Sequence, residues 1–156
     1  MTRRITGLGV AALAAAACAS GVRPGYSPFP QATVDTVSAT PVQAIQELTQ
    51  GLGTEAIQIQ WSSPAEGYLE TMWYNVVTRE SGQTDRNNPD RFIKLRFWAD
   101  PVGTDQTVVT AEAVTWRTTD PSIVIEREKE MLVPPGHAGE QILRRIMNGL
   151  AERYGG

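Results

Sequence analysis

The chain has 156 residues, a size that suits one small domain with a terminal extension. It carries 14 basic and 17 acidic residues, and this mild acidity argues against a nucleic-acid partner, which needs clustered lysine and arginine. Hydrophobic residues make up 41% of the chain, enough for a packed core, and the single cysteine, Cys18, excludes an internal disulfide.

The first 17 residues have the pattern of a secretory signal peptide. Arg3 and Arg4 form a short positive region, and an apolar run follows from Ile5 to Ala17. This run is shorter than the roughly 20 residues that a transmembrane helix needs. We therefore expect residues 1–17 to be removed, which leaves 12 basic and 17 acidic residues and a net charge of −5.

Cys18 directly follows the small residues that end the apolar run. The arrangement resembles the lipobox of bacterial lipoproteins, in which the cysteine is diacylated and becomes the mature N-terminus; that family prefers leucine where this chain has Ala15. Ordinary cleavage after Ala17 or Ala19 is the alternative. A cysteine at the cleavage point of an otherwise cysteine-free chain favours lipidation, with palmitate among the acyl groups.

The predicted lipid anchor indicates a location in the cell envelope. Ala19 follows the cysteine and is not an acidic retention signal, so the outer membrane is favoured if the cell has two membranes. The domain would then lie in the periplasm or at the cell surface, held to the membrane by the acyl chains.

Residues 18–38 are expected to form the lipidated N-terminus and a linker, because no helical or alternating apolar period appears there. Proline favours an extended backbone of about 3.1 Å per residue, so such a linker would hold the domain tens of ångströms from the bilayer. Tyr26 and Phe29 are interpreted as isolated aromatics in this linker, with docking on a partner as the alternative. The prolines of the segment are Pro24, Pro28 and Pro30.

Residues 39–156 are expected to fold as a single α+β domain that begins with a helix. Thr40, Pro41 and Gln43 form a capping box with proline at the first helical position, and apolar residues at helical spacing continue to Gly51. A second amphipathic pattern predicts a closing helix from about residue 138 to 153.

Between these helices the sequence predicts strands. Alternating residues predict a half-buried strand at 57–61, and β-branched and aromatic residues predict strands at 68–78, 91–98 and 106–117, with a short strand at 122–126. Short connections favour an antiparallel meander. The predicted fold is an α+β two-layer sandwich, an antiparallel sheet of four to five strands with the N- and C-terminal helices on one face, in a helix-grip-like arrangement.

Residue types that form enzymatic sites are sparse. The lone histidine, His137, stands at a predicted helix start and is expected to be a cap or a surface residue. No nucleophile elbow, phosphate loop or metal motif occurs. A site built from carboxylates would need Glu70 with Glu112, which we expect on different faces or far apart. We therefore expect no enzymatic activity, no metal and no cofactor.

Aromatic residues on the predicted strands are the candidate interaction residues. Trp98 falls on the same side of its strand as Lys94 and Arg96, which we expect to reach solvent, and an exposed tryptophan there would be a binding anchor. We expect most of these aromatics to pack in the core or at its rim, and a binding role is the alternative. The candidate interaction residues are Tyr68, Trp73, Trp98 and Trp116.

Part of the chain resembles a family of bacterial lipoproteins. Residues 67–73 resemble the Gly-x-x-x-Thr-x-Trp strand of BamC-like (NlpB) lipoproteins, accessory subunits of the outer-membrane β-barrel assembly machinery, and residues 91–95 resemble the strand that follows it there. Residues 107–110 and 141–150 are similar to the next strand and the closing helix, so the likeness covers about residues 40–153. It implies a helix-grip domain and an envelope location. The long partner-binding segment and second domain of that family have no counterpart in the organisation expected here.

Two hypotheses for function follow. The first is a non-enzymatic envelope lipoprotein whose domain binds envelope proteins, in line with an accessory role in outer-membrane protein assembly. The alternative is a lipoprotein that binds a small apolar ligand in a pocket between a helix and a curved sheet. No feature of the sequence indicates an oligomeric state.

Overall fold

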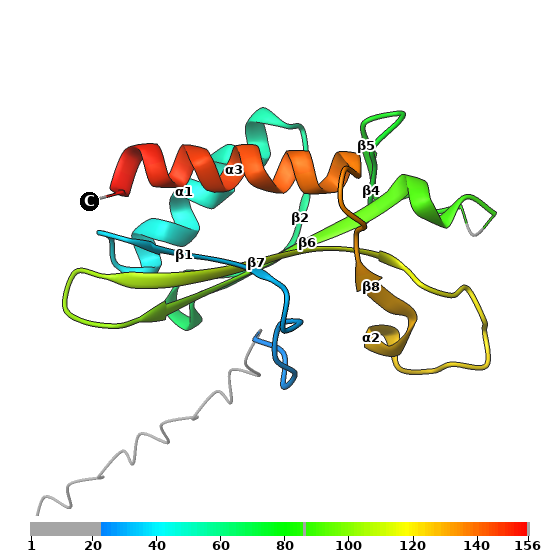
Figure 1. The fold of residues 1–156 in the computed structure, drawn as a ribbon, viewed down its shortest axis with the longest axis horizontal. Coiled ribbons are helices and arrows are strands. Elements are labelled where there is room, and N and C mark those ends of the chain that lie inside the picture. The colour runs from blue at the N-terminus through cyan, green and yellow to red at the C-terminus, as the bar shows by residue number, and fades with distance from the viewer. Residues whose placement is uncertain (1–22, 86, 156) are drawn as a thin grey trace, which may run out of the picture.

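The computed structural model describes residues 23–85 and 87–155, so the predicted signal peptide and Cys18 lie outside the described residues. Within them the chain forms three α-helices and an antiparallel sheet of eight strands (Figure 1). The predicted α+β class is confirmed, and the predicted number of strands is too low. No helix in the described ranges is long and apolar enough to cross a membrane.

Helix α1 (Pro41–Thr54) begins at the predicted capping box. The Thr40 hydroxyl accepts from the Gln43 N–H at 3.3 Å, and the Gln43 side chain accepts from the Thr40 N–H at 2.9 Å. These bonds satisfy donors that a helix start otherwise leaves unpaired. The helix continues past Gly51, where the predicted helix ended. Gly51 faces Ile146 of the closing helix, and a Cβ there would make an ordinary van der Waals contact of 3.4 Å.

Helix α3 (Ala138–Tyr154) closes the fold. His137 is its N-cap, as predicted, and its Nδ1 accepts from the Gly139 N–H at 3.0 Å. A Cβ at Gly139 would lie 2.8 Å from a methyl group of Ile93, so the glycine allows the helix start to approach the sheet closely. Both α1 and α3 lie on the same side of the sheet (Figure 1) and contact each other.

The sheet has two long central strands with shorter strands beside them. Its order is β1-β7-β6-β3-β2, with β8 also paired to β7, β4 paired to β6, and β5 paired to β4. Two strands share each outer edge of the central pair, which is why there are more strands than predicted. The strands are β1 (Thr33–Val37), β2 (Ile59–Ser63), β3 (Tyr68–Thr71), β4 (Tyr74–Asn75), β5 (Glu80–Ser81), β6 (Phe92–Pro101), β7 (Thr107–Trp116) and β8 (Glu130–Leu132).

Three predicted segments differ in the structure. The predicted linker is wrong from Thr33 onward, since β1 pairs with residues 107–111 of β7. The predicted strand at 68–78 is interrupted between β3 and β4, and both pieces lie along β6. The predicted strand at 122–126 is absent, and α2 (Glu126–Lys129) and β8 follow instead.

Two 3-10 turns complete the fold, η1 (Pro64–Glu66) and η2 (Pro89–Arg91). Gly67 ends η1 in the left-handed region, with φ of 63°. A Cβ there would lie 2.1 Å from the Ala99 carbonyl oxygen, so glycine is required both by the backbone conformation and by the close approach of β6.

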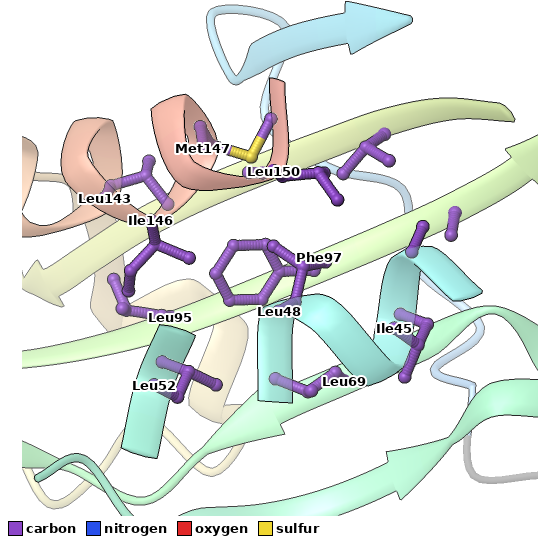
Figure 2. Packing of buried hydrophobic residues seen from close by; sticks show 14 of the residues in the cluster. Ile45, Leu48, Leu52, Leu69, Leu95, Phe97, Leu143, Ile146, Met147 and Leu150 are labelled. Carbon is purple, nitrogen blue, oxygen red and sulfur yellow. The ribbon is translucent and has the colours of Figure 1, made fainter. Parts of the chain in front are cut away.

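The apolar core lies between the helices and one face of the sheet (Figure 2). The helical stripes that the sequence predicted supply one side of it, and every second residue of β3, β6 and β7 supplies the other. The members labelled in Figure 2 are Ile45, Leu48, Leu52, Leu69, Leu95, Phe97, Leu143, Ile146, Met147 and Leu150.

Candidate functional site

The opposite face of the sheet carries charged residues, and we call it the charged face. Glu70 of β3, Arg96 of β6 and Glu112 of β7 are direct cross-strand neighbours in one row. Arg96 was expected to reach solvent, but its side chain is 3% exposed. Glu70 and Glu112 were expected to lie apart, yet both contact Arg96. The expectation was wrong because alternation shows which residues share a face and not what covers that face.

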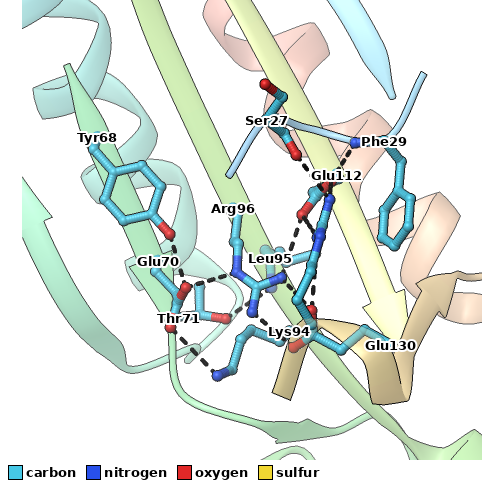
Figure 3. Close-up of polar contacts among 11 residues, drawn as sticks. Ser27, Phe29, Tyr68, Glu70, Thr71, Lys94, Leu95, Arg96, Glu112 and Glu130 are labelled. Atoms are coloured by element: carbon cyan, nitrogen blue, oxygen red, sulfur yellow. Dashed lines mark hydrogen bonds and ion pairs between the residues drawn. The ribbon is translucent and has the colours of Figure 1, made fainter. Parts of the chain in front are cut away.

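Arg96 is the centre of this cluster (Figure 3). Its Nε lies 2.6 Å from Glu70 Oε2, and its Nη1 lies 3.3 Å from Glu112 Oε1. Its two terminal nitrogens also donate to Glu130 of β8, with Nη1 to Oε2 at 2.6 Å and Nη2 to Oε1 at 2.7 Å. Such a bidentate ion pair is among the strongest charge-assisted contacts in proteins. Burial acts to lower the pKa of Arg96, but the carboxylates of Glu130 and Glu70 outweigh burial and raise this pKa above its ordinary value. The guanidinium therefore stays charged.

Two further residues complete the surroundings of Glu70. Lys94 Nζ lies 3.3 Å from Oε1, and the Tyr68 hydroxyl donates to Oε2 at 2.7 Å. Burial acts to raise the pKa of the Glu70 carboxyl, but Arg96 and Lys94 outweigh it and hold this pKa below its ordinary value. Burial raises the pKa of Tyr68, and the Glu70 charge raises it further. Glu70 therefore stays ionised at neutral pH and Tyr68 stays protonated.

Helix α2 brings a third cation to the cluster. Arg127 binds Glu112 through both terminal nitrogens, with Nη2 to Oε2 at 3.1 Å. The same Nη2 donates to the Ser27 carbonyl at 3.2 Å, and the guanidinium carbon lies 3.7 Å from the ring centre of Phe29. Glu130 directly follows α2 and is itself buried, with an exposed fraction of 3%.

Residues 23–32 lie over the charged face, and we call them the cover segment. The Phe29 N–H donates to Glu112 Oε2 at 3.1 Å, and the ring of Tyr26 lies 4.7 Å from the Arg127 guanidinium carbon. Burial raises the pKa of Tyr26. The interpretation of these two aromatics as isolated linker residues is therefore wrong. They shield the ion cluster from water.

The cluster is balanced in charge and in hydrogen bonding. It has three carboxylates and three cations, and every buried side-chain nitrogen or oxygen in the described ranges has a partner. The described residues contain no group of three His, Cys, Asp or Glu placed to hold a metal ion. These contacts join the cover segment, α2 and β8 to the sheet.

The predicted interaction residues divide into two pairs on this face. Tyr68 and Trp98 are 1% and 2% exposed and pack against each other with ring centres 5.5 Å apart. The expected packing of these aromatics is therefore confirmed for Tyr68 and Trp98, and the alternative of an exposed Trp98 is wrong. Trp73 and Trp116 are partly exposed, with ring centres 4.5 Å apart, and Lys94 Nζ lies 5.1 Å from the Trp73 ring. The structure does not bring the four residues together into one site.

Sequence reasoning missed Trp61, whose exposed fraction is 53%. Ile59 is paired with Thr71 but Trp61 with Glu70, so Gln60 is an additional residue in β2. This β-bulge turns Trp61 from the core side, where alternation placed it, to the side of Glu70. Among the described residues only β3 pairs with β2, so the other edge of this strand is open. The sequence contains no turn residue that would have marked the bulge.

A second feature lies beside the outer edge of β7, which pairs with β1 along one part of its length and with β8 along another. Thr33 of β1 pairs with Ala111 and Leu132 of β8 pairs with Val114, which leaves a break between the two strands. A pocket of about 530 Å³ opens there below α3. Its apolar lining includes Ala111, Ala113, Met131, Val133, Pro134 and Leu143.

Comparison with known proteins identifies no relative: no protein-family model matches the chain, and no curated protein matches it in sequence. The geometry of the open edge, the pocket and the charged face is therefore what bears on function.

Proposed function

We propose that this chain is a non-enzymatic lipoprotein domain of the bacterial cell envelope, tethered through Cys18, which binds extended segments of other envelope proteins along β2. The observation that carries the binding proposal is Trp61, which is 53% exposed on a strand whose outer edge is open. The tether rests on the lipobox-like residues that end at Cys18.

An open strand edge and an exposed tryptophan favour the same kind of partner. Unpaired backbone N–H and C=O groups at a sheet edge can be satisfied by an added strand of another protein. Lipid offers no such partner groups. Tryptophan is enriched among the residues that dominate the energy of protein interfaces. A peptide strand that pairs with β2 and packs on Trp61 would use both features.

The charged face supports the non-enzymatic part of the proposal. Its carboxylates, Glu70, Glu112 and Glu130, are each held by arginine, and the lowered pKa of Glu70 suits an ion pair and not a general acid at neutral pH. Ion pairs of this kind explain the burial of five charged side chains, and the partial burial of Arg127, without any reaction.

The finer assignment is also part of the proposal. We propose that the arrangement is helix-grip-like and that the protein is an accessory to outer-membrane protein assembly. Support comes from the resemblance of residues 67–73 and 91–95 to BamC-like lipoproteins. The outer membrane is the proposed location, because Ala19 is not an acidic retention signal.

A photo-crosslinking amino acid at position 61 in intact bacterial cells tests the binding surface. We expect covalent adducts with one or a few envelope proteins, mapped to an extended segment of each. The matched control is position 102 in the turn between β6 and β7, where Val102 is 58% exposed but lies on no open strand. Equal adducts at both positions, or none at position 61, would contradict the proposal.

Mass spectrometry of the mature protein from purified membranes tests the anchor separately. We expect an N-terminal Cys18 that carries acyl chains, and release of a Cys18→Ser variant into the soluble fraction. An unmodified N-terminus at another residue would show that ordinary cleavage occurs and that the tether is wrong.

The pocket beside β7 favours a second candidate, binding of a small apolar ligand. Its volume of about 530 Å³ lies in the range of small-molecule sites. Titration with a fluorescent fatty acid would show saturable binding that Met131→Glu abolishes and Val102→Glu leaves unchanged, because Met131 lines the pocket and Val102 does not. Absence of saturable binding would remove this candidate.

A further inference from the structure

The cover segment is attached to the sheet at its first described residue. Arg23 Nη2 lies 2.8 Å from Asp100 Oδ1, and the Arg23 N–H donates to Glu66 Oε2 at 3.0 Å. Arg23 Nη1 also donates to the Glu66 carbonyl at 3.1 Å. The chain that leads back to Cys18 therefore leaves the folded domain at a defined point on the charged face.

The tether between this point and Cys18 is short. Arg23 is five residues after Cys18. An extended chain spans at most about 3.3–3.6 Å per residue, so Arg23 can lie at most about 18 Å from Cys18. The expected linker of about twenty residues would have allowed tens of ångströms and any orientation. A tether of five residues instead keeps the charged face on the side of the anchor.

Two consecutive aliphatic residues are exposed on this side of the domain. Val124 and Ile125 are 90% and 58% exposed and directly precede α2. Arg127 of α2 contacts Ser27 and Phe29 of the cover segment, which places the pair beside that segment. Figure 1 shows α2 and the cover segment together on the side of the sheet opposite α1 and α3.

The opposite side of the molecule is charged and suits contact with water. The outer surfaces of α1 and α3 carry charged residues joined in ion pairs. Arg145 Nε lies 2.8 Å from Glu55 Oε1, and Arg144 Nη2 lies 2.8 Å from Glu140 Oε1. Burial of such charges in lipid would be costly, which disfavours contact between the helix side and a membrane.

We propose that the side of the domain formed by the cover segment and α2 lies against the lipid bilayer, with Val124 and Ile125 inserted at the interface. The inference rests on the proposed anchor at Cys18, which supplies the attachment. Transfer of the aliphatic pair from water into the membrane interface lowers the free energy, and the short tether orients the pair toward the membrane. The helices would then face the aqueous compartment.

Fluorescence quenching on vesicles tests this orientation. Cys18 is the sole cysteine, so the chain from Cys18 onward can be coupled chemically to a maleimide phospholipid and placed on phosphatidylcholine vesicles. The reporter variant is Ile125→Trp. The matched control is Val77→Trp, since Val77 is 65% exposed between β4 and β5, which lie on the same side of the sheet as α3 in Figure 1. The quencher is phosphatidylcholine brominated in its acyl chains.

We expect brominated lipid to remove additional tryptophan emission from Ile125→Trp, relative to the parent chain, and none from Val77→Trp. Equal quenching of both variants, or of neither while both remain on the vesicles, would overturn the orientation. An insertion of about ten Gly/Ser residues after position 22 should reduce the quenching of Ile125→Trp. Unchanged quenching would overturn the role of the short tether.

These outcomes are independent of the anchor in cells. Chemical coupling attaches the lipid whether or not the cell acylates Cys18, so a negative quenching result refutes only the orientation. A negative mass-spectrometry result at Cys18 refutes the proposed tether and leaves the vesicle measurement interpretable as a property of the domain.

Discussion

The two faces of the central strands are stabilised in different ways, although they are made by alternate residues of the same segments. Along β6, Leu95 and Phe97 enter the apolar core, while Lys94 and Arg96 enter the ion cluster. Apolar burial lowers the free energy of folding with little regard to which apolar neighbour is present. A buried charge is tolerated only when its partners are all in place. The charged face therefore depends on distant parts of the chain in a way the core does not.

The largest expected effect comes from a substitution at the centre of the charged face. Arg96→Leu would leave Glu70 and Glu130 without their main cation, and removal of one partner from a buried ion pair costs about 3–5 kcal/mol. We expect a loss of about 4 kcal/mol in the free energy of unfolding, measured by urea denaturation. Arg96→Lys, which keeps the charge but not the two-pronged contact, should lose less. A loss below about 1 kcal/mol for Arg96→Leu would contradict the importance of the cluster.

A matched change in the core sharpens the contrast. Leu48 is 1% exposed in the apolar core, and Leu48→Ala should lower the free energy of unfolding by about 3 kcal/mol through lost burial and a cavity. Because no charge is involved, we expect this loss to be the same at low and high salt. A strong salt dependence of the loss would show that the two faces are not energetically separate.

The cover segment provides a weaker test of the charged face. Phe29→Ala removes the ring that lies 3.7 Å from the Arg127 guanidinium carbon. We expect a loss of about 1–2 kcal/mol in urea denaturation, since a desolvated cation–π contact is of this size. Phe29→Tyr keeps an aromatic face and serves as the control. If both variants unfold like the parent chain, the segment does not contribute to stability.

The pH dependence of stability should come in part from Glu70. Its pKa in the folded protein lies below the ordinary value of 4.5, so the folded state favours the ionised form. The resulting stabilisation is present above about pH 4.5 and is lost as the pH falls through the folded-state pKa. Glu70→Gln should therefore reduce the acid-induced loss of stability, as measured by urea denaturation between pH 3 and 7. An unchanged pH profile would contradict the assignment.

The smallest effect is expected on the outer helix surface. Arg153 pairs with Glu47 there, but its side chain is 56% exposed, and such pairs contribute little. Arg153→Gln should change the free energy of unfolding by less than about 0.5 kcal/mol, by the same denaturation measurement. A loss comparable to that of Arg96→Leu would remove the distinction between covered and exposed ion pairs.

Local patterns predicted the elements better than their surroundings. The capping box at Thr40, the cap at His137 and the strand that became β7 were all visible in short stretches of sequence, because each depends on neighbouring residues. Arg96 was assigned to solvent because the same strand pattern would arise with or without a covering layer. Trp61 was missed because a bulge depends on how two strands pair.

The sequence by itself determined the types of the main elements and the apolar stripes that form the core, since both follow from periodicity along the chain. The signal peptide and the acylation of Cys18 remain predictions from local residue patterns. Only the tertiary structure decided that the charged face is buried, because its cover comes from residues 23–32 and 126–130, which lie far from β6 in the sequence. Burial of a strand face is a non-local property, and it changed a presumed linker into part of the folded domain.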